Sequence, residues 1–474
     1  MRTLSLLLFF FVGIVAVHSS VQAAIQEPEI EVLPNGLTVA WFTSPKLPIV
    51  DFVFLVKAGC KGDPLGKSGT AQLVAETMDH GAAGLTAQQI SRAIESLGAT
   101  RAVSVEEDAF TVGVHGLAPD AKTLLDLLFK IAIQPDFPLA EVTREQARIL
   151  DRWSHLKDYS DSLASLALGR LLSWGTPYQR GGLLSAAEFK GVTRGDVDAF
   201  HKAYFVPSNS ILAVVGQVKR EELRPLLLKG FGDSEKFPPS EVLGVPSRGY
   251  FDPRLKMAAT TAQGPFRRVI IVDRPLLKQA QIRIGVRAPL MGDPEHYALV
   301  VGNALIGELF DSRLNGLIRD QLGLTYGVQS SFAYKKEFAS FNISTSTRTD
   351  QVGLVVKKTV EALKQIQNGE LTQEEVKTAK EFLVGGFPLS TSTLESVASH
   401  WLAGTVFDLG AGYLNEFSPR VRAVTRDQVV AALRKHLNLE NLVIVIAGSS
   451  DEIEKSLSAS GIKPLKRLSV KDLE

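Results

Sequence analysis

Apolar positions along the chain follow two periods, one typical of strands and one typical of helices. The runs LPIVDFVFLV (47–56) and AQIRIGV (280–286) predict strands. The segments TAQQISRAIESLG (86–98) and LFDSRLNGLIRDQLG (309–323) have the three-to-four-residue spacing of amphipathic helices. Since strands and helices do not strictly alternate, the pattern favours an α+β sandwich over a doubly wound parallel sheet.

Two sequence patterns occur once in each half of the chain. KAGCKGDP (57–64) resembles RAPLMGDP (287–294), and each follows one of the predicted strands. Residues 192–216 resemble residues 424–448, and each segment predicts a helix with a threonine cap, a loop and a buried strand. Both pairs are offset by about 230 residues, which indicates a duplicated domain.

The predicted boundaries follow from this repeat. A proline-rich stretch without helical period begins at residue 231 and predicts an irregular linker over 231–267. We therefore expect two tandem homologous α/β sandwich domains, arranged as a clamshell, at 24–230 and 268–474.

The first 23 residues have the features of a secretory signal. Arg2 precedes an apolar run, and Val21-Gln22-Ala23 ends it with a small-residue cleavage site. No later apolar stretch has the roughly 18 residues that a membrane span needs. We expect export, most simply to a bacterial periplasm, and the alternative is a membrane anchor formed by an uncleaved signal. Cys60 is the single cysteine, so no intramolecular disulfide can form.

The balance of charges argues against polyanionic partners. The 52 Lys and Arg residues nearly match the 51 Asp and Glu residues, and removal of Arg2 with the signal makes the numbers equal. A surface without net positive charge gives no electrostatic reason to bind nucleic acid or an anionic membrane.

The helix GTAQLVAETMDHG (69–81) resembles the zinc helix of the pitrilysin/insulinase (inverzincin) peptidases, which reads G-x-AHxxEH. On that pattern Gln72 replaces the first His, Ala75 the Glu base and Glu76 the second His. The third ligand of the family falls on Thr143. Glutamine and threonine are poor zinc ligands and alanine accepts no proton, so the resemblance predicts a degenerate site that holds no metal.

A second interpretation is that the same helix binds a metal through a different set of residues. Glu76 and His80 are four residues apart and Asp79 is adjacent, which is the spacing of a two-ligand helix face. Alternatively, His80 lies in the last helical turn, where a basic group favours the helix dipole and Gly81 ends the helix. We favour the structural interpretation, in which His80 binds no metal.

The segment SRLNGLIRDQLGLTYGV (312–328) resembles the family's other signature, R-x-x-x-G-x-x-Y. Arg319 and Tyr326 match its Arg and Tyr. The helix is expected to end near Leu322, and Gly323 supplies the left-handed residue before a strand that carries Tyr326. The resemblance implies that Arg319 binds the substrate carbonyl while the Tyr326 hydroxyl stabilises the oxyanion.

Each of these two residues also has a purely structural interpretation. Arg319 would form a surface ion pair with Asp320 or Asp311, and Tyr326 would be a half-buried strand aromatic. Occurrence of both at the family spacing favours the functional interpretation.

Two features of the first half bear on peptide binding. Active relatives carry Asn-Ala on the strand after the zinc helix, where extended peptide docks, and this chain has Arg101-Ala102. The acidic run at 106–108 is expected to be an exposed turn or strand end.

The resemblance to the pitrilysin/insulinase family implies that this chain is the non-catalytic subunit of a zinc metallopeptidase of the bacterial two-chain type. Arg319 and Tyr326 would act in trans on peptides held at the zinc of an HxxEH-bearing partner. The heterodimer would enclose a chamber for unfolded peptides, and this chain alone would be inactive and would carry no cofactor. The alternatives are a peptide-binding or scaffold protein of the same fold, and an enzyme with an unusual metal site at Glu76 and His80.

Overall fold

The computed structural model describes residues 25–473 except 47, 157, 181–185 and 231–263. The predicted signal and most of the predicted linker therefore lie outside the described residues. Among the residues described, no helix combines the length and the apolar character needed to cross a bilayer.

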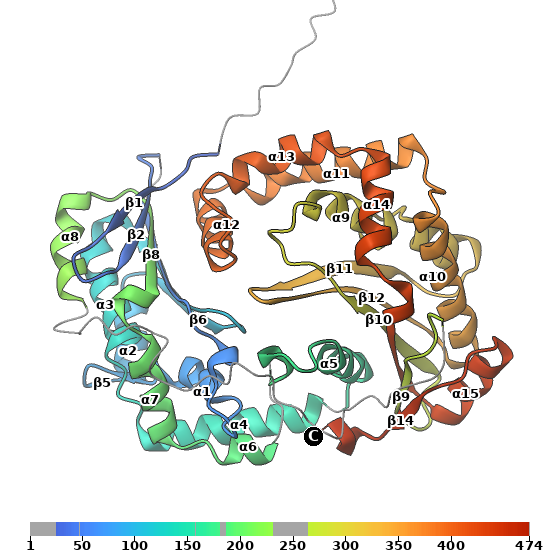
Figure 1. Cartoon of the computed structure of the whole chain (residues 1–474). Coiled ribbons are helices and arrows are strands. Elements are labelled where there is room, and N and C mark those ends of the chain that lie inside the picture. The colour runs from blue at the N-terminus through green and yellow to red at the C-terminus, as the bar shows by residue number, and fades with distance from the viewer. Residues whose placement is uncertain (1–24, 47, 157, 181–185, 231–263, 474) are drawn as a thin grey trace, which may run out of the picture.

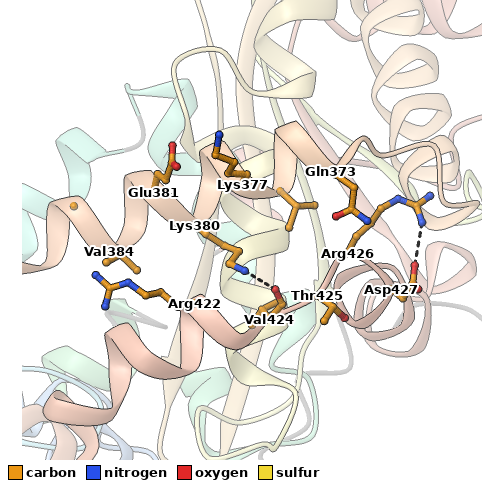
Figure 2. Close-up of a pocket in the computed structure, with 12 residues that line it drawn as sticks. Gln373, Lys377, Lys380, Glu381, Val384, Arg422, Val424, Thr425, Arg426 and Asp427 are labelled. Carbon is orange, nitrogen blue, oxygen red and sulfur yellow. Dashed lines mark hydrogen bonds and ion pairs between the residues drawn. The ribbon is translucent and has the colours of Figure 1, made fainter. Parts of the chain in front are cut away.

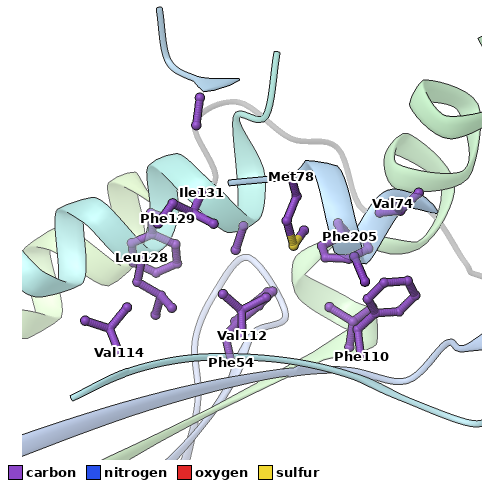
Figure 3. Close-up of a cluster of buried hydrophobic side chains, with 14 of the residues drawn as sticks. Phe54, Val74, Met78, Phe110, Val112, Val114, Leu128, Phe129, Ile131 and Phe205 are labelled. Carbon is purple, nitrogen blue, oxygen red and sulfur yellow. The ribbon is translucent and has the colours of Figure 1, made fainter. Parts of the chain in front are cut away.

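The first half of the chain builds one six-stranded sheet with the order β1-β2-β8-β3-β7-β6. Its strands are β1 (Glu29–Val32), β2 (Thr38–Thr43), β3 (Ile49–Val56), β6 (Thr100–Val105), β7 (Phe110–Leu117) and β8 (Ser210–Gly216). Its helices are α1 (Thr70–Thr77), α2 (Ala87–Glu95), α3 (Ala121–Ile133), α4 (Leu139–Leu156), α6 (Ala186–Lys190), α7 (Arg194–Tyr204) and α8 (Arg220–Lys229). In the core, Phe54 and Val112 of the strands meet Met78 after α1 and Phe129 of α3 (Figure 3).

The second half builds another six-stranded sheet with the order β11-β12-β10-β13-β9-β14. Its strands are β9 (Val269–Asp273), β10 (Gln279–Arg287), β11 (Val328–Lys335), β12 (Phe338–Arg348), β13 (Val443–Gly448) and β14 (Lys466–Leu468). Its helices are α9 (His296–Asn303), α10 (Val352–Gln367), α11 (Gln373–Ser390), α13 (Tyr413–Ala423), α14 (Arg426–His436) and α15 (Ser450–Ala459). Two π-helices, η7 (Ala304–Glu308) and η8 (Asn315–Gln321), follow α9.

The predicted repeat is visible in the strand order. Five neighbouring strands have the same order in the two sheets: β2-β8-β3-β7-β6 in the first and β9-β13-β10-β12-β11 in the second. In both sheets the first two strands of this series are parallel. Thr193 and Thr425 form capping boxes at the start of α7 and α14, as the sequence predicted. The α+β fold with two homologous sandwiches is thus confirmed.

One helix of each half packs on the sheet of the other half (Figure 1). Helix α5 (Ser160–Leu172) packs Leu163 and Leu171 on the face of the second sheet that carries Val443 and Val445. Helix α12 (Leu394–Val406) packs Trp401 on Phe42 of the first sheet, with the ring centroids 5.9 Å apart. The sequence pattern did not predict this exchange.

We expect Trp401→Ala to destabilise the whole chain, because Trp401 is only 5% exposed and fills the contact between α12 and the first sheet. Removal of a buried Trp side chain typically costs about 3–5 kcal/mol. Urea unfolding followed by circular dichroism would measure this loss.

The matched control is Leu389→Ala, at a leucine that is 77% exposed. An effect of Trp401→Ala no larger than that of the control would contradict the structural role of the exchanged helix.

Candidate functional site

The entry to α1 is built by an aspartate and a glycine. The Asp63 carboxylate accepts hydrogen bonds from the backbone N–H groups of Gly69, at 2.6 Å, and Ala71, at 2.7 Å, and caps the helix. Gly69 has a φ of +90°, and a Cβ atom there would lie 2.4 Å from the Phe189 ring. The glycine-rich start of the predicted zinc helix is therefore retained as a structural feature.

The predicted zinc-ligand positions on α1 hold no ligand set. Ala75 is buried, and Gln72 and Glu76 are half-buried. The Glu76 carboxylate accepts a hydrogen bond from Arg148 Nη2 at 2.6 Å and two from the Arg152 guanidinium at 3.3 Å. Two cationic side chains of α4 therefore bind the one carboxylate among these three positions.

Thr143 does not face this carboxylate. Its side chain is exposed, and its hydroxyl donates to the Leu139 carbonyl at 2.9 Å. On an α-helix, position 143 points about 140° away from position 148 and about 180° away from position 152. The assignment of the third ligand position to Thr143 is therefore corrected, and Arg148 and Arg152 are the α4 residues that lie at Glu76.

Ion pairs connect Glu76 to the surrounding acids. Arg148 also binds Glu145, Arg144 binds Glu141 and lies 3.5 Å from Glu145, and Arg101 of β6 binds Asp79 at 2.8 Å. We call this the α1–α4 network, and its charged members are the four arginines 101, 144, 148 and 152 and the four acids 76, 79, 141 and 145. Because the charges balance, a zinc ion would add two uncompensated positive charges. The residues present do not fit a zinc ion.

His80 takes part in this network and does not form a helix cap. Helix α1 ends at Thr77, so His80 lies beyond its last turn. His80 nitrogens lie 3.7 Å from Asp79 and 3.5 Å from Glu141. Since Arg101 holds Asp79 and the α4 arginines hold Glu76, the structure does not support a metal face at Glu76 and His80.

Elsewhere in the described part of the chain, one trio of side chains has atoms at metal-ligand spacing: Asp293, Glu295 and His436. Lys435 Nζ already binds the Glu295 carboxylate at 2.7 Å, and His436 Nε2 lies 2.5 Å from the same oxygen. A protein cation therefore already binds the Glu295 carboxylate of this trio.

Arg319 lies near the end of η8, and Gly323 has a φ of +61°, as the sequence predicted. The guanidinium binds the Asp320 carboxylate through Nε at 2.7 Å and Nη2 at 3.0 Å, and Nη2 also donates to the Phe310 carbonyl at 3.1 Å. It stacks 3.9 Å from the centre of the Phe310 ring. The expected ion pair with Asp320 is therefore present, and four contacts fix the direction of the guanidinium.

Tyr326 differs from both of its expected placements on a strand. It precedes β11 by two residues and is 95% exposed, so it is not a half-buried strand aromatic. Hydrogen bonds hold the backbone next to it. The buried Asn315 amide pairs with both the N–H and the carbonyl of Val328, at 2.8 and 3.1 Å, and the Thr345 hydroxyl donates to the Gly327 carbonyl at 2.9 Å. The Tyr326 ring is therefore exposed, while hydrogen bonds fix the backbone next to it.

Arg319 and Tyr326 line one open hollow of about 580 Å³. The hollow lies over β10, β11 and β12, and its wall includes Phe310, Glu308 and Asn315. The structure thus brings together the two residues that the second signature predicted, on elements separate from α1.

The acidic turn between β6 and β7 contacts the other half of the chain. Glu107 binds Lys335, and the Asp108 carboxylate accepts from Tyr178 Oη at 2.7 Å and from the Lys336 backbone N–H at 2.8 Å. The expectation of a simply exposed turn was therefore incomplete, because sequence alone does not show which surface faces the turn.

Two parts of the sequence match known families. Residues 38–172 match "Insulinase (Peptidase family M16)", and residues 191–383 match "Peptidase M16 inactive domain"; together they cover more than half of the chain. The chain belongs to peptidase family M16. This is the pitrilysin/insulinase family that the two signatures resemble.

The M16 relatives extend over nearly the whole chain. An uncharacterized zinc protease of Mycobacterium tuberculosis is 23% identical over 441 residues, which cover 92% of this chain and 97% of the relative. The mitochondrial-processing peptidase subunit beta of Saccharomyces cerevisiae is 20% identical, with 92% and 94% covered. The crystal structure of a peptidase M16 inactive domain from Pseudomonas fluorescens is 25% identical, has a TM-score of 0.76 and covers 89% of this chain and 98% of that one.

A separate groove of about 730 Å³ lies along α11 and the ends of α13 and α14, and it contains none of the predicted M16 site residues (Figure 2). Its basic groups are largely used within the chain. Lys380 donates to the Val424 carbonyl at 2.8 Å, and Arg426 binds Asp427 at 2.9 Å. We assign this groove no chemistry.

The α1–α4 network predicts what restores an M16 zinc site. Replacing residues 72, 75 and 76 by His, Glu and His (Q72H/A75E/E76H) should not be sufficient, because Arg152 remains on the face of α4 that meets α1 and supplies no carboxylate ligand. Adding Arg152→Glu supplies a carboxylate on the face of α4 that meets α1. We expect this variant to bind about one zinc per chain, measured by elemental analysis after dialysis.

The matched control adds Thr143→Glu to the same triple change. Zinc binding by the Thr143→Glu variant, and none by the Arg152→Glu variant, would contradict the geometry described above.

Proposed function

We propose that this chain is the non-catalytic subunit of a two-chain M16 metallopeptidase. It donates Arg319 and Tyr326 in trans to peptides held by a partner subunit that carries an intact HxxEH helix. The zinc ion and the general base belong to the partner, and this chain alone cleaves no peptide.

The observation that carries the proposal is a contrast between the two halves. In the first half, the α1–α4 network replaces the metal ligands by balanced ion pairs. In the second half, Arg319 and Tyr326 keep the family spacing and line a common hollow. A chain with no role in catalysis has no need to keep a donor pair directed at an open surface.

The chemistry of the pair suits the stabilisation of a developing negative charge. The Arg319 guanidinium is held by Asp320 and the Phe310 carbonyl, so it is already oriented before substrate arrives. The Tyr326 hydroxyl forms no hydrogen bond to a described residue and is free to donate to an oxyanion. Donors of this kind are effective only where water is excluded. Because Tyr326 is 95% exposed, a partner surface must supply that exclusion.

The relatives support a two-chain arrangement. Two of them are named as mitochondrial-processing peptidase subunits beta, and a solved relative is titled an inactive domain. We propose that the partner of this chain belongs to the same family and that the heterodimer encloses a chamber for unfolded peptides. Export to a periplasm directed by residues 1–23 completes the proposal.

The second candidate is a peptide-binding or scaffold protein of the same fold. The exposed ion pairs of Arg148 and Arg152 at the former metal position favour neither candidate. The distinction depends on whether the partner needs Arg319 and Tyr326.

Arg319→Ala and Tyr326→Phe should each lower the kcat/KM of the reconstituted two-chain enzyme by about 10²–10³, which is the usual cost of losing one oxyanion donor. Complex formation, measured by size-exclusion chromatography, and zinc content should be unchanged, because neither residue binds metal.

Arg348→Ala is the control, since Arg348 is an exposed arginine at the end of β12 whose one ion-pair partner among the described residues is Asp350. If Arg319→Ala and Tyr326→Phe leave turnover at the level of this control, the chain is a scaffold.

A further inference from the structure

Three polar side chains, one from each of three neighbouring strands, form the floor of the hollow beside Tyr326, and we call them the polar row. Arg283 of β10 lies directly opposite Ser344 of β12, and Ser344 lies directly opposite Gln329 of β11. Opposed residues in a sheet have Cβ atoms about 4.5–5.5 Å apart, so these three side chains can contact one ligand group together. All three line the same hollow as Arg319 and Tyr326.

Arg283 has no direct carboxylate partner among the described residues. Its Nε donates to Ser165 Oγ of α5 at 3.0 Å, and its Nη1 donates to the Ile282 carbonyl at 3.1 Å and to Gln281 Oε1 at 3.4 Å. Nη2 donates to no described atom. Burial lowers the pKa of Arg283, an effect that nearby Asp161 opposes, but an arginine remains a cation at neutral pH.

The other polar side chains of the row are also unengaged. The side chains of Ser344 and Gln329 form no hydrogen bond to a described residue, and the same holds for Ser346, which lies opposite Gln281 in the neighbouring row. Ser344 and Ser346 are half-buried and Gln329 is exposed. Donors without protein partners, beside a cation without a carboxylate, form a surface that is complementary to an anion.

The remaining charges of the hollow do not neutralise Arg283. Arg319 is already paired with Asp320. The Glu308 carboxylate accepts from Asn303 Nδ2 at 2.7 Å and forms no ion pair with Arg283. Burial raises the pKa of Glu308. Arg283 is therefore the cation of the hollow that lacks a direct counter-ion.

We propose that this hollow is a subsite for a carboxylate of the peptide substrate, bound by Arg283 Nη2 together with Ser344 and Gln329. The carboxylate comes from an acidic side chain near the scissile bond or from the peptide C-terminus. The proposal rests on the proposed function, because Arg319 and Tyr326 at the rim of the hollow place the substrate there. It extends that function by naming a carboxylate as the group of the peptide that this hollow recognises.

The test compares four peptides of one unstructured sequence. They carry Glu or Gln at the residue next to the cleaved bond, each with a free or an amidated C-terminus. Fluorescence anisotropy measures their binding to the full-length chain alone, and kcat/KM is measured with the two-chain complex. We expect the wild-type chain to favour the carboxylate by about tenfold or more in both assays, as charge-assisted hydrogen bonds do.

Arg283→Gln should reduce this preference to near one, whereas Arg283→Lys should keep a part of it. The matched control is Arg287→Gln, two residues along β10, because Arg287 also bridges to α5, through the Leu172 carbonyl at 2.6 Å, but lies outside the hollow. The control should keep the full preference. If the preference follows the Glu side chain, the subsite takes an acidic residue; if it follows amidation, the subsite takes the C-terminus.

Equal binding of all four peptides, no binding of any, or a preference that survives Arg283→Gln would overturn the subsite. These failures are separate from failure of the proposed function. If the chain prefers the carboxylate in binding but turnover is insensitive to Arg319→Ala, the subsite is supported and the chain is a peptide-binding protein.

Discussion

Each sheet of this molecule has two apolar faces to cover, and its own helices cover only one of them. The exchange of α5 and α12 solves this constraint, since each helix buries the second face of the opposite sheet. The exchange couples the halves more tightly than a linker could. It also bears on the hollow, because Ser165 of α5 accepts a hydrogen bond from Arg283. The orientation of the Arg283 side chain therefore depends on a contact between segments far apart in sequence.

The first half shows how this fold keeps the architecture of a zinc helix with side chains that do not fit a zinc ion. Asp63 still caps α1, so the helix begins where a zinc helix would begin. Arginines of α4 then take the role that a cation would have at this point, and they hold α1 and α4 together through Glu76. Charge balance explains why the degenerate site is stable without metal. It also explains why no single substitution is expected to restore zinc binding.

Local sequence signals predicted much of the fold and only part of the site. Threonine caps and the repeated GDP segment carry their information within a few residues, so the duplicated sandwiches and the turn at Gly323 could be predicted. The contacts between side chains of different helices could not be predicted. The sequence placed the third ligand at Thr143, whereas packing of α4 brings Arg148 and Arg152 to Glu76. Likewise, no periodicity shows that Tyr326 is left exposed before β11.

The central claim is that this chain completes an active site whose metal lies on another chain. The most direct measurement is affinity purification of the tagged full-length chain from its native cell envelope, followed by mass spectrometry and zinc analysis of the eluate. We expect a comparable amount of an HxxEH-bearing M16 chain with about one zinc per pair. A metal-free eluate without such a chain, or zinc bound to this chain alone, would contradict the central claim.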